Sequence, residues 1–505
     1  MRLPGGLPSL TEMTSLWLDG HVPPAASSDP QLRLFDDIVI GAGITGLSTA
    51  LMLARAGRSV AIVDARFPGA VATGNSTAKV SLLQGTRLSQ IARNHSDRVV
   101  RAYVDANRHG QDWLADFCRE AGVTVENRDA VTFASTPDAA ATVDREFTVA
   151  RQAGLHVDRV ATIDVPFPTF GAVVLADQFQ VDPMEFVSAL VAAFSSAGGT
   201  LVIGTTVTNV RAGAPCTLET TAGEFEASNV VLATGTPFLD RGLYFAKLTA
   251  NRSYALAFEV PGEVPPGMYL SADTPARSVR TAVVRGRRLL IVGGNGHAVG
   301  RHPSPASLVD DLRDWTREYF PGAVETHAWS AQDYAADNEI PFVGHLPRGR
   351  GRISLATGFD KWGMTNGPAA ALRIASEILG QETLPWAKVL GRRMTVPADL
   401  GEGIVEGARV ARNAAVGWVG AISTPAPDAT AEGSGEVGTL DGEPVAVSTV
   451  DGTTCRVSAV CPHLGGIVTW NDQERSWDCP LHGSRFAASG ERLEGPATRG
   501  LKPVV

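Results

Sequence analysis

Two segments near the C-terminus contain residues whose types and spacing suit a metal cluster. CPHLGG contributes Cys461 and His463, and CPLHGSRF contributes Cys479 and His482. Two thiolates can hold one iron of a two-iron, two-sulfur cluster while two neutral imidazoles hold the other, so that each segment supplies one ligand of each type. A Cys2His2 zinc site is the alternative, but Cys-x-His followed by Cys-x-x-His is not zinc-finger spacing. The pattern therefore predicts a histidine-ligated [2Fe-2S] cluster.

A second chemical signature lies near the N-terminus. GAGITG places Gly41, Gly43 and Gly46 directly after a predicted strand, 36–40, and at the start of a predicted helix. The glycines permit a tight turn, close approach of a pyrophosphate and close helix packing, while the helix start offers N–H groups to phosphate. Asp64 ends the next predicted strand, where its carboxylate can accept hydrogen bonds from ribose hydroxyls. This unit predicts a dinucleotide site, although glycines alone do not decide between FAD and NAD.

Alternating strands and helices must position both signatures. Helical and strand patterns return at 183–210, while 243–330 is rich in predicted strands, and a strand, loop and helix follow at 354–379. The first domain is thus interrupted and resumed. From residue 436 onward, short strands are separated by DG and GG turns, which predicts a small all-β unit.

Composition shifts set the expected domain boundaries. Residues 1–34 are rich in Pro, Gly and Ser and predict an irregular arm, and residues 391–435 have a linker composition that cannot build a core. The remaining chain divides into a discontinuous nucleotide-binding domain (35–84, 166–242 and 331–390), a substrate or cap domain (85–165 and 243–330), and the C-terminal unit (436–505).

Bulk composition narrows the function classes. The 505 residues are 44% hydrophobic and 19% charged, which is ordinary for a globular protein of several domains. A net charge of −9, without runs of lysine and arginine, argues against a nucleic-acid partner. No run approaches the ~20 apolar residues of a membrane span, and Glu12 and Asp19 interrupt any signal-peptide core, so we expect a cytoplasmic protein. Outside the cluster motif, Cys118, Cys216 and Cys455 are expected to be core or surface thiols.

The chain resembles the D-amino-acid oxidase and glycine oxidase superfamily, and most closely its branch of FAD-dependent oxidoreductases with a Rieske domain. The resemblance covers nearly the whole length. Its marks are SLWLD, GNSTAKVSLLQG, DQFQVDPMEFVSAL, LATG, WSAQDY and GFDKWGMTNG, followed by WDCPLHGSRF and GPATRGL.

The resemblance implies FAD as the dinucleotide and a Rieske-type [2Fe-2S] cluster. It implies an α/β fold with a Rossmann-like FAD-binding domain, an interleaved β-rich substrate domain and a small all-β Rieske domain. The cofactor-binding residues that the glycine motif and the resemblance together predict are Gly41, Gly43, Ile44, Thr45, Gly46, Asp64, Ala65, Ser76, Thr77, Ala78, Lys79, Val207, Thr234, Gly235, Phe359, Trp362, Gly363, Met364 and Thr365.

Departures from the Rieske pattern bear on the redox potential. Respiratory-type members bridge the two cluster loops with a disulfide, whereas the corresponding positions here are Gly466 and Leu481. Ser484 matches a residue that donates a hydrogen bond to cluster sulfur in high-potential members, but Phe486 replaces a second donor, a tyrosine. Because fewer donors stabilise the reduced cluster less, we expect a potential in the lower half of the roughly −150 to +300 mV Rieske range.

The expected reaction is oxidation of a small amine, imine or amino-acid-like substrate by hydride transfer to flavin. The cluster would then relay single electrons between the flavin and an external partner such as oxygen, a ferredoxin or a quinone. Thr365 stands where the superfamily often has a basic residue that anchors the substrate carboxylate, so Lys361 and Arg280 are the candidate catalytic substitutes. Gln84 stands where this branch usually has a histidine.

Two other functions remain open from the residues. The chain could be a non-catalytic electron-transfer or redox-sensing protein. A Rieske oxygenase would need an iron site of two histidines and a carboxylate; His297 and His302 are suggestively spaced, but Gly294 occupies the expected carboxylate position. The nearby glycines of GGNGHAVG, 293–300, have the wrong spacing for a second nucleotide site and are followed by prolines, so we expect a β-turn there.

Overall fold

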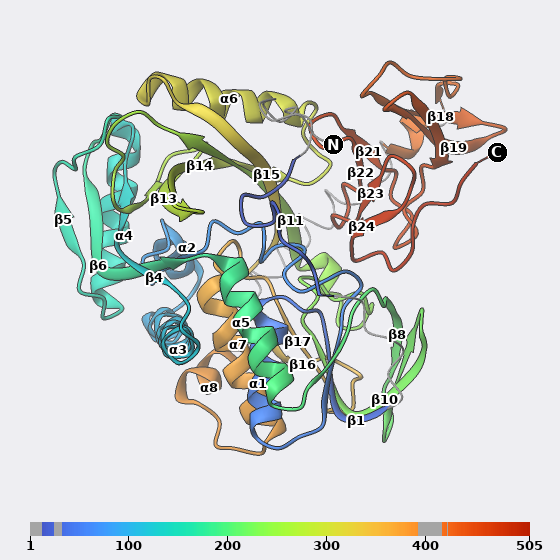
Figure 1. Ribbon diagram of the computed structural model, residues 1–505, viewed down its shortest axis with the longest axis horizontal. Coiled ribbons are helices and arrows are strands. Elements are labelled where there is room, and N and C mark those ends of the chain that lie inside the picture. Colours follow the sequence, from blue (N-terminus) through green and yellow to red (C-terminus); the bar gives the residue numbers. More distant parts are fainter. Residues whose placement is uncertain (1–12, 25–32, 392–416, 422, 505) are drawn as a thin grey trace.

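A computed structural model describes residues 13–24, 33–391, 417–421 and 423–504. These residues form two large sheets with flanking helices and, at the C-terminus, two small sheets (Figure 1). The mixed α/β architecture with its all-β C-terminal region confirms the predicted fold class. Most of the predicted N-terminal arm, 1–12 and 25–32, lies outside the described residues, and 13–24 contains no helix or strand.

The first large sheet contains the predicted dinucleotide-binding unit. Strand β1 pairs in parallel with β10 on one side and with β2 on the other. Since a central parallel strand is covered on both faces, it is a continuous apolar run rather than an alternating one, as in DDIVI. The strand order is β16-β17-β10-β1-β2-β7, with β9 attached to β10 and β8 to β9. The strands are β1 (Leu34–Ile40), β2 (Val60–Val63), β7 (Thr200–Val202), β8 (Val207–Arg211), β9 (Cys216–Thr220), β10 (Gly223–Leu232), β16 (Phe342–His345) and β17 (Ile353–Thr357).

The second large sheet has the order β15-β11-β14-β13-β12-β4-β6-β3, with β5 attached to β6. Its long strand β11 pairs antiparallel with β14 on one side and with β15 on the other, and β11 and β15 run beside the C-terminal region (Figure 1). The strands are β3 (Lys79–Val80), β4 (Val125–Phe133), β5 (Asp158–Val160), β6 (Ala172–Val181), β11 (Leu248–Glu259), β12 (Met268–Ser271), β13 (Arg277–Val284), β14 (Arg287–Ala298) and β15 (Val324–Ala336).

Glycines allow the helices around the first sheet to pack closely. A Cβ atom on Gly367 of α7 would lie 2.9 Å from the hydroxyl of Thr45 on α1, and one on Gly110 of α3 would lie 2.1 Å from the Thr365 carbonyl oxygen. Helices α1 and α7 therefore meet almost backbone to backbone, which fixes the starts of both helices at one place. The helices are α1 (Ile44–Arg55), α2 (Arg87–Asn94), α3 (Asp97–Ala121), α4 (Ala140–Gln152), α5 (Pro183–Ser196), α6 (Pro305–Tyr319), α7 (Gly363–Ile378) and α8 (Pro385–Gly391), with single 3-10 turns η1 (Pro137–Ala139) and η2 (Tyr244–Ala246).

The C-terminal region consists of two antiparallel sheets, β18-β19-β20 and β21-β22-β23-β24. Its core includes Trp477 and Phe486, both fully buried. The second sheet lies beside β11 and β15 (Figure 1). The strands are β18 (Gly435–Leu440), β19 (Glu443–Val450), β20 (Thr453–Ser458), β21 (Thr469–Asn471), β22 (Ser476–Asp478), β23 (Arg485–Ala487) and β24 (Arg492–Glu494).

Several expected boundaries differ from the observed sheets. The segments 35–84, 166–242 and 331–390 were expected to form the FAD-binding domain, yet β3, β6 and the end of β15 pair into the second sheet. A strand pattern shows that a strand exists but not which sheet it joins. Of the expected linker 391–435, residues 392–416 and 422 lie outside the described residues, whereas Pro425 and Glu432 pair with Thr439 and Thr449 of the C-terminal unit.

The β-turn expected at 293–300 is wrong for most of its length. Strand β14 continues to Ala298 because Gly293 and Gly294 pair with β11 and β13 on its two sides, and the turn begins only at Val299. The glycines that suggested a turn instead lie in a strand, at positions where neighbouring atoms leave no room for a side chain. Within the described ranges, no helix combines the length and the apolar character that crossing a membrane would need.

Candidate functional site

A deep cavity begins at the carboxyl ends of the parallel strands. Its wall contains Gly41, where a side chain is excluded because φ is +104° and a Cβ would lie 2.5 Å from the Ala233 carbonyl oxygen. Helix α1 starts after Gly43 with no side-chain cap and no acidic residue in its first turn. An uncapped helix start beside glycines is a site for phosphate groups, because its N–H groups and dipole favour negative charge.

Asp64 lies beside this phosphate-binding turn. Its carboxylate accepts hydrogen bonds from the Ala42 N–H (2.7 Å) and the Arg66 N–H (2.7 Å). Burial raises the pKa of Asp64, while these two backbone N–H groups oppose the rise. The held carboxylate lines the cavity next to Val207, where ribose hydroxyls of a dinucleotide could donate to it.

Most of the predicted cofactor residues line this one cavity, which has a volume of about 440 Å³. Gly46 lies behind the turn, where a Cβ would meet the Gly41 carbonyl oxygen at 1.9 Å, and Ala78 and Thr365 are buried outside the lining. The predicted residues that line it are Gly41, Gly43, Ile44, Thr45, Asp64, Ala65, Ser76, Thr77, Lys79, Val207, Thr234, Gly235, Phe359, Trp362, Gly363 and Met364, together with the catalytic candidate Lys361.

The structure separates the two catalytic candidates. Arg280 is buried outside the cavity lining, donates to the Thr77 carbonyl oxygen and lies over the Trp17 ring, with 5.4 Å from its guanidinium carbon to the ring centroid. Lys361 lines the cavity, and its Nζ atom lies against Gly296. A Cβ on Gly296 would lie only 2.7 Å from Lys361 Nζ. Gly296 belongs to the motif that was expected to form a β-turn.

Asp333 on β15 is a cavity residue that the sequence did not single out. Its Oδ2 atom is buried and has no hydrogen-bond partner among the described residues. Burial raises the pKa of Asp333 to about 7, and the charge of Asp360 adds to this rise, whereas Lys361 opposes it. A carboxylate with one unpartnered oxygen and the amine of Lys361 therefore both face this cavity.

Lys79 adds a second amine to the cavity wall. Its Nζ atom donates to the Tyr269 carbonyl oxygen (2.6 Å) and the Ser278 hydroxyl (2.7 Å). Burial, and then the positive charge of Arg280, lower the pKa of Lys79 well below its ordinary value. This lysine can therefore be neutral beside a bound cofactor.

The two positions that depart from the superfamily pattern meet behind α7. Gln84 donates to the Thr365 hydroxyl (3.1 Å) and accepts from the Tyr103 hydroxyl (2.7 Å), and Thr365 donates to Asn107 (2.6 Å). All four are buried, and none lines the cavity. This polar network ties α3 to α7, so Gln84 and Thr365 position the helix rather than touch a ligand.

The four cluster-ligand candidates lie in two loops with the same backbone pattern. Cys461 N–H donates to the Gly466 carbonyl oxygen (2.8 Å), and Cys479 N–H donates to that of Ser484 (2.8 Å). In each loop the glycine four residues after the cysteine has φ above +70° and donates back to the cysteine carbonyl oxygen at 3.0 Å. Such turns aim the cysteine and the following histidine in one direction.

The donor set fits a two-iron cluster better than a single metal ion. The thiol of Cys479 lowers the pKa of Cys461 to about 7, and the His463 and His482 rings lie 5.1 Å apart. Across the described segments, no group of three or more His, Cys, Asp or Glu side chains is placed to hold one metal ion.

Both imidazoles are in the form that binds metal. Burial lowers the pKa of His463 and takes that of His482 to about 3, so the rings are neutral. Both ring nitrogens of His463 and the Nε2 atom of His482 are buried and have no hydrogen-bond partner among the described residues, so each ring keeps a nitrogen available to a metal. Asp240 Oδ1 lies 3.3 Å from His463 Nε2, an arrangement in which a carboxylate orients a metal-bound imidazole.

The space of the missing disulfide is filled by packing. All five cysteines are free thiols, and a Cβ on Gly466 would lie 2.7 Å from the Leu481 side chain. Ser484 accepts a hydrogen bond from the Ala497 N–H (3.0 Å), which leaves its own proton for a cluster sulfur. Phe486 is buried and offers no donor.

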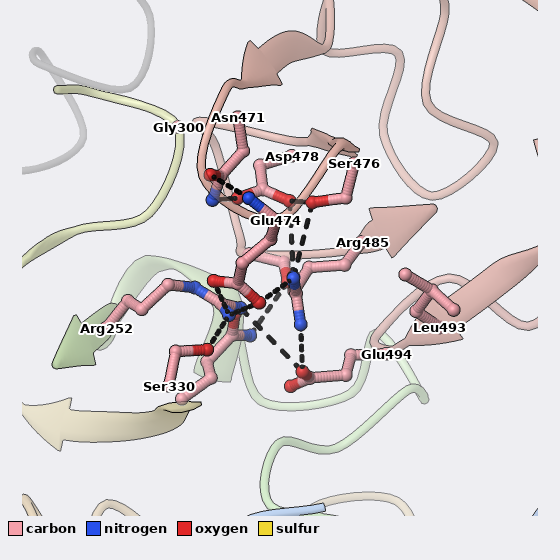
Figure 2. A network of polar contacts seen from close by, with 12 residues as sticks. Arg252, Gly300, Ser330, Asn471, Glu474, Ser476, Asp478, Arg485, Leu493 and Glu494 are labelled. Carbon is pink, nitrogen blue, oxygen red and sulfur yellow. Dashed lines mark hydrogen bonds and ion pairs between the residues drawn. The ribbon is translucent and has the colours of Figure 1, made fainter. Parts of the chain in front are cut away.

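A buried charge network holds the C-terminal unit against β11 (Figure 2). Arg252 donates to Glu474 (2.8 and 3.0 Å), and Arg485 pairs with Asp478 (3.2 Å) and Glu494 (2.8 Å). Burial opposes ionisation of Glu474, but the two guanidinium groups hold its pKa below the ordinary value. The network therefore joins β11 to the C-terminal unit through charged groups that are buried and paired with one another.

The cavity and the cluster loops share one wall. Gln332 lines the cavity and donates to the Gly483 carbonyl oxygen (2.8 Å), next to the ligand candidate His482. From the other side, residues 492–498 line the cavity, and Ala497 in this segment donates to Ser484 of the second cluster loop. Arg492 reaches the Thr206 hydroxyl (3.1 Å) at the Asp64 end. The two sites are therefore separated by single residues.

Comparisons with known proteins agree with this arrangement. The family model described as FAD dependent oxidoreductase matches residues 36–377, and the one described as Rieske [2Fe-2S] domain matches residues 425–504. The putative Rieske 2Fe-2S iron-sulfur protein YhfW of Bacillus subtilis (strain 168) is 30% identical over 488 residues, 95% of each chain. These matches confirm the predicted family and both predicted cofactors.

Two solved structures share the larger part of the fold. Glycine oxidase from Geobacillus kaustophilus aligns with a TM-score of 0.60 and 20% identity, covering 72% of this chain and 100% of that one. L-proline dehydrogenase from P. horikoshii aligns with a TM-score of 0.58 and 16% identity, covering 70% and 96%.

Proposed function

Because this chain belongs to the FAD-dependent oxidoreductase family and carries a Rieske [2Fe-2S] domain, we propose that it oxidises a small amine, imine or amino-acid-like substrate and relays the electrons singly through the cluster. Bound FAD supplies two-electron hydride chemistry, and the cluster supplies one-electron steps. The protein contributes the shared wall between the two sites and the charged groups that hold the substrate.

The shared wall carries this proposal. Gln332 lines the FAD cavity and hydrogen-bonds the cluster loop at Gly483, while Ala497 lines the same cavity and hydrogen-bonds Ser484. An FAD-dependent enzyme that needed only oxygen would have no use for a second redox centre in contact with its cofactor cavity. The buried ion pair of Arg252 and Glu474 joins β11 to the C-terminal unit beside this wall.

Charge placement supports the substrate class. Lys361 can hold a carboxylate, and Asp333, with its pKa raised to about 7, can accept a proton from a substrate ammonium group. A neutral amine is the form that gives up a hydride readily, so a carboxylate that takes the proton prepares the substrate. The similar folds of a glycine oxidase and an L-proline dehydrogenase agree with an amino-acid-like substrate.

The proposal is tested by anaerobic mixing of the holoprotein with a panel of amines, imines and amino acids. We expect bleaching of the flavin by one group of compounds, followed by the EPR signal of a reduced Rieske cluster. In the Cys479→Ser variant the flavin should still bleach while the EPR signal is missing. Flavin bleaching without cluster reduction in the parent protein would reject the relay, and no bleaching with any compound would favour a non-catalytic redox protein.

A further inference from the structure

A surface hollow beside the cluster collects arginines that are scattered in the sequence. We name it the arginine pocket; its lining includes Arg211, Asp240, Arg241, Arg348 and Arg350. Arg348 and Arg350 are exposed in the loop between β16 and β17, and both have left-handed backbones with φ of +58° and +53°. Non-glycine residues adopt this conformation at a cost, and such residues are concentrated at functional sites.

The arginine pocket keeps a positive charge after its local pairs are considered. Arg211 is balanced by Glu219 and Glu224 at the edge of the hollow. Arg241 donates to the Val210 carbonyl oxygen (2.6 Å), but its buried Nη1 atom has no hydrogen-bond partner among the described residues. Asp240 is the acidic residue of the lining. Because the whole chain carries a net charge of −9, this basic surface stands out against an acidic molecule.

The same surface lies directly over the cluster ligands. Asp240 touches His463 Nε2 at 3.3 Å, and the Phe245 ring lies 5.4 Å from the His482 ring. Between Asp240 and Phe245, Leu243 is 58% exposed, and Leu464, which follows His463, is 44% exposed. The imidazoles are therefore covered by a segment, 240–245, that carries the exposed Leu243 and reaches the arginine pocket at Asp240.

From this surface we infer the electron partner: an acidic one-electron carrier protein that docks over Leu243 and Leu464 and is oriented by Arg348 and Arg350. The carrier gives up one electron and the oxidised cluster takes it, or the reverse. A pyridine nucleotide would deliver a hydride and has no use for this side of the cluster. Charge complementarity of this kind raises association rates and selects partners. The inference rests on the proposed function only in requiring a redox-active cluster.

The test uses an acidic plant-type [2Fe-2S] ferredoxin as the probe. Its reduced form is mixed anaerobically with oxidised holoprotein, and cluster reduction is followed by stopped-flow absorbance at low and high salt. At low salt, R348E/R350E should slow the second-order rate at least about tenfold, the lower end of electrostatic steering, whereas R348K/R350K should not. The matched control R98E/R101E makes the same charge change at exposed positions of α3 and should react like the parent protein.

Three results would overturn this inference. They are a parent rate that does not fall with salt, equal rates for R348E/R350E and R98E/R101E, and faster low-salt reaction of the cluster with a basic c-type cytochrome than with the ferredoxin. The ferredoxin reaction needs neither substrate nor flavin reduction. The docking inference can therefore still be tested if the protein oxidises none of the substrates in the panel. Conversely, a normal ferredoxin rate says nothing about transfer from the flavin.

Discussion

Replacing Arg252 by methionine tests how the two parts of the molecule are joined. In the buried network, two guanidinium groups face the carboxylates of Glu474, Asp478 and Glu494 (Figure 2). The Arg252 side chain is 1% exposed and that of Glu474 is 9% exposed, so water cannot take over the lost partner. Arg252→Met leaves three buried carboxylates with one guanidinium group, and breaking a buried pair in this way costs about 3–5 kcal/mol.

The reverse truncation should be milder. Glu474→Gln leaves two positive and two negative groups and keeps an oxygen for Arg252, so it should cost about 1.5 kcal/mol, the worth of one charge-assisted hydrogen bond. The sign of the pH effect follows from the same charges. Because the pKa of Glu474 is held low in the folded protein, its contribution is present at neutral pH and is lost as the pH falls through that lowered value. In Arg252→Met the loss should begin at a higher pH.

Urea titrations followed by the visible circular dichroism of the cluster measure both changes. Arg288→Met, at an exposed position of the neighbouring strand β14, is the control and should stay within about 0.5 kcal/mol of the parent protein. The reasoning is refuted if Arg252→Met loses less free energy of unfolding than Glu474→Gln, or no more than Arg288→Met.

Three further predictions concern the two cofactor sites. Arg492→Ala should weaken FAD retention on dialysis at least about tenfold through loss of a charged hydrogen-bond donor, while exposed Arg499→Ala should not; equal retention would contradict a role for Arg492 in the cavity wall. Asp333→Asn should remove an ionisation near pH 7 from the flavin absorption spectrum, since the carboxyl loses its proton as the pH rises through its pKa of about 7; an unchanged transition would assign it elsewhere. Ser484→Ala should lower the cluster midpoint potential in an EPR-monitored titration, because a hydroxyl donor to cluster sulfur is lost; a higher potential would reject that hydrogen bond.

Features encoded within one short segment were readable from the sequence. The cluster loops repeat one backbone pattern around Cys461 and Cys479, and every turn residue lies within five positions of its cysteine. The phosphate-binding turn is equally local, since Gly41 and Gly43 directly join a strand to a helix. In both cases neighbouring residues in the chain are neighbours in space, so spacing alone carries the geometry.

Features that depend on distant segments were not readable. Asp333 belongs to a strand whose sheet partners lie about 80 residues earlier, and its environment is set by Lys361 and Asp360 from another loop. Residues 492–498 line the cavity although they lie more than 400 residues from the glycine turn. No local pattern reports that such segments meet.

The glycine motif at 293–300 shows how one residue type can mislead. Gly296 leaves room for Lys361, and Gly300 approaches the Pro480 backbone of the second cluster loop, where a Cβ would lie 2.9 Å from the Pro480 nitrogen. Glycine here serves close approach within a strand and at a domain contact. A cluster of glycines is the sequence pattern both for a turn and for close approach of two backbones, so the pattern alone does not distinguish them.

Electron transfer within one molecule between the flavin and the cluster is the central claim. A short light pulse with a deazaflavin photoreductant, under anaerobic conditions, can add less than one electron per holoprotein while absorbance follows both centres. We predict that the flavin and cluster signals change together with one first-order rate constant that is independent of protein concentration. A rate constant proportional to protein concentration, or a flavin that keeps its electron while the cluster stays oxidised, would contradict the account.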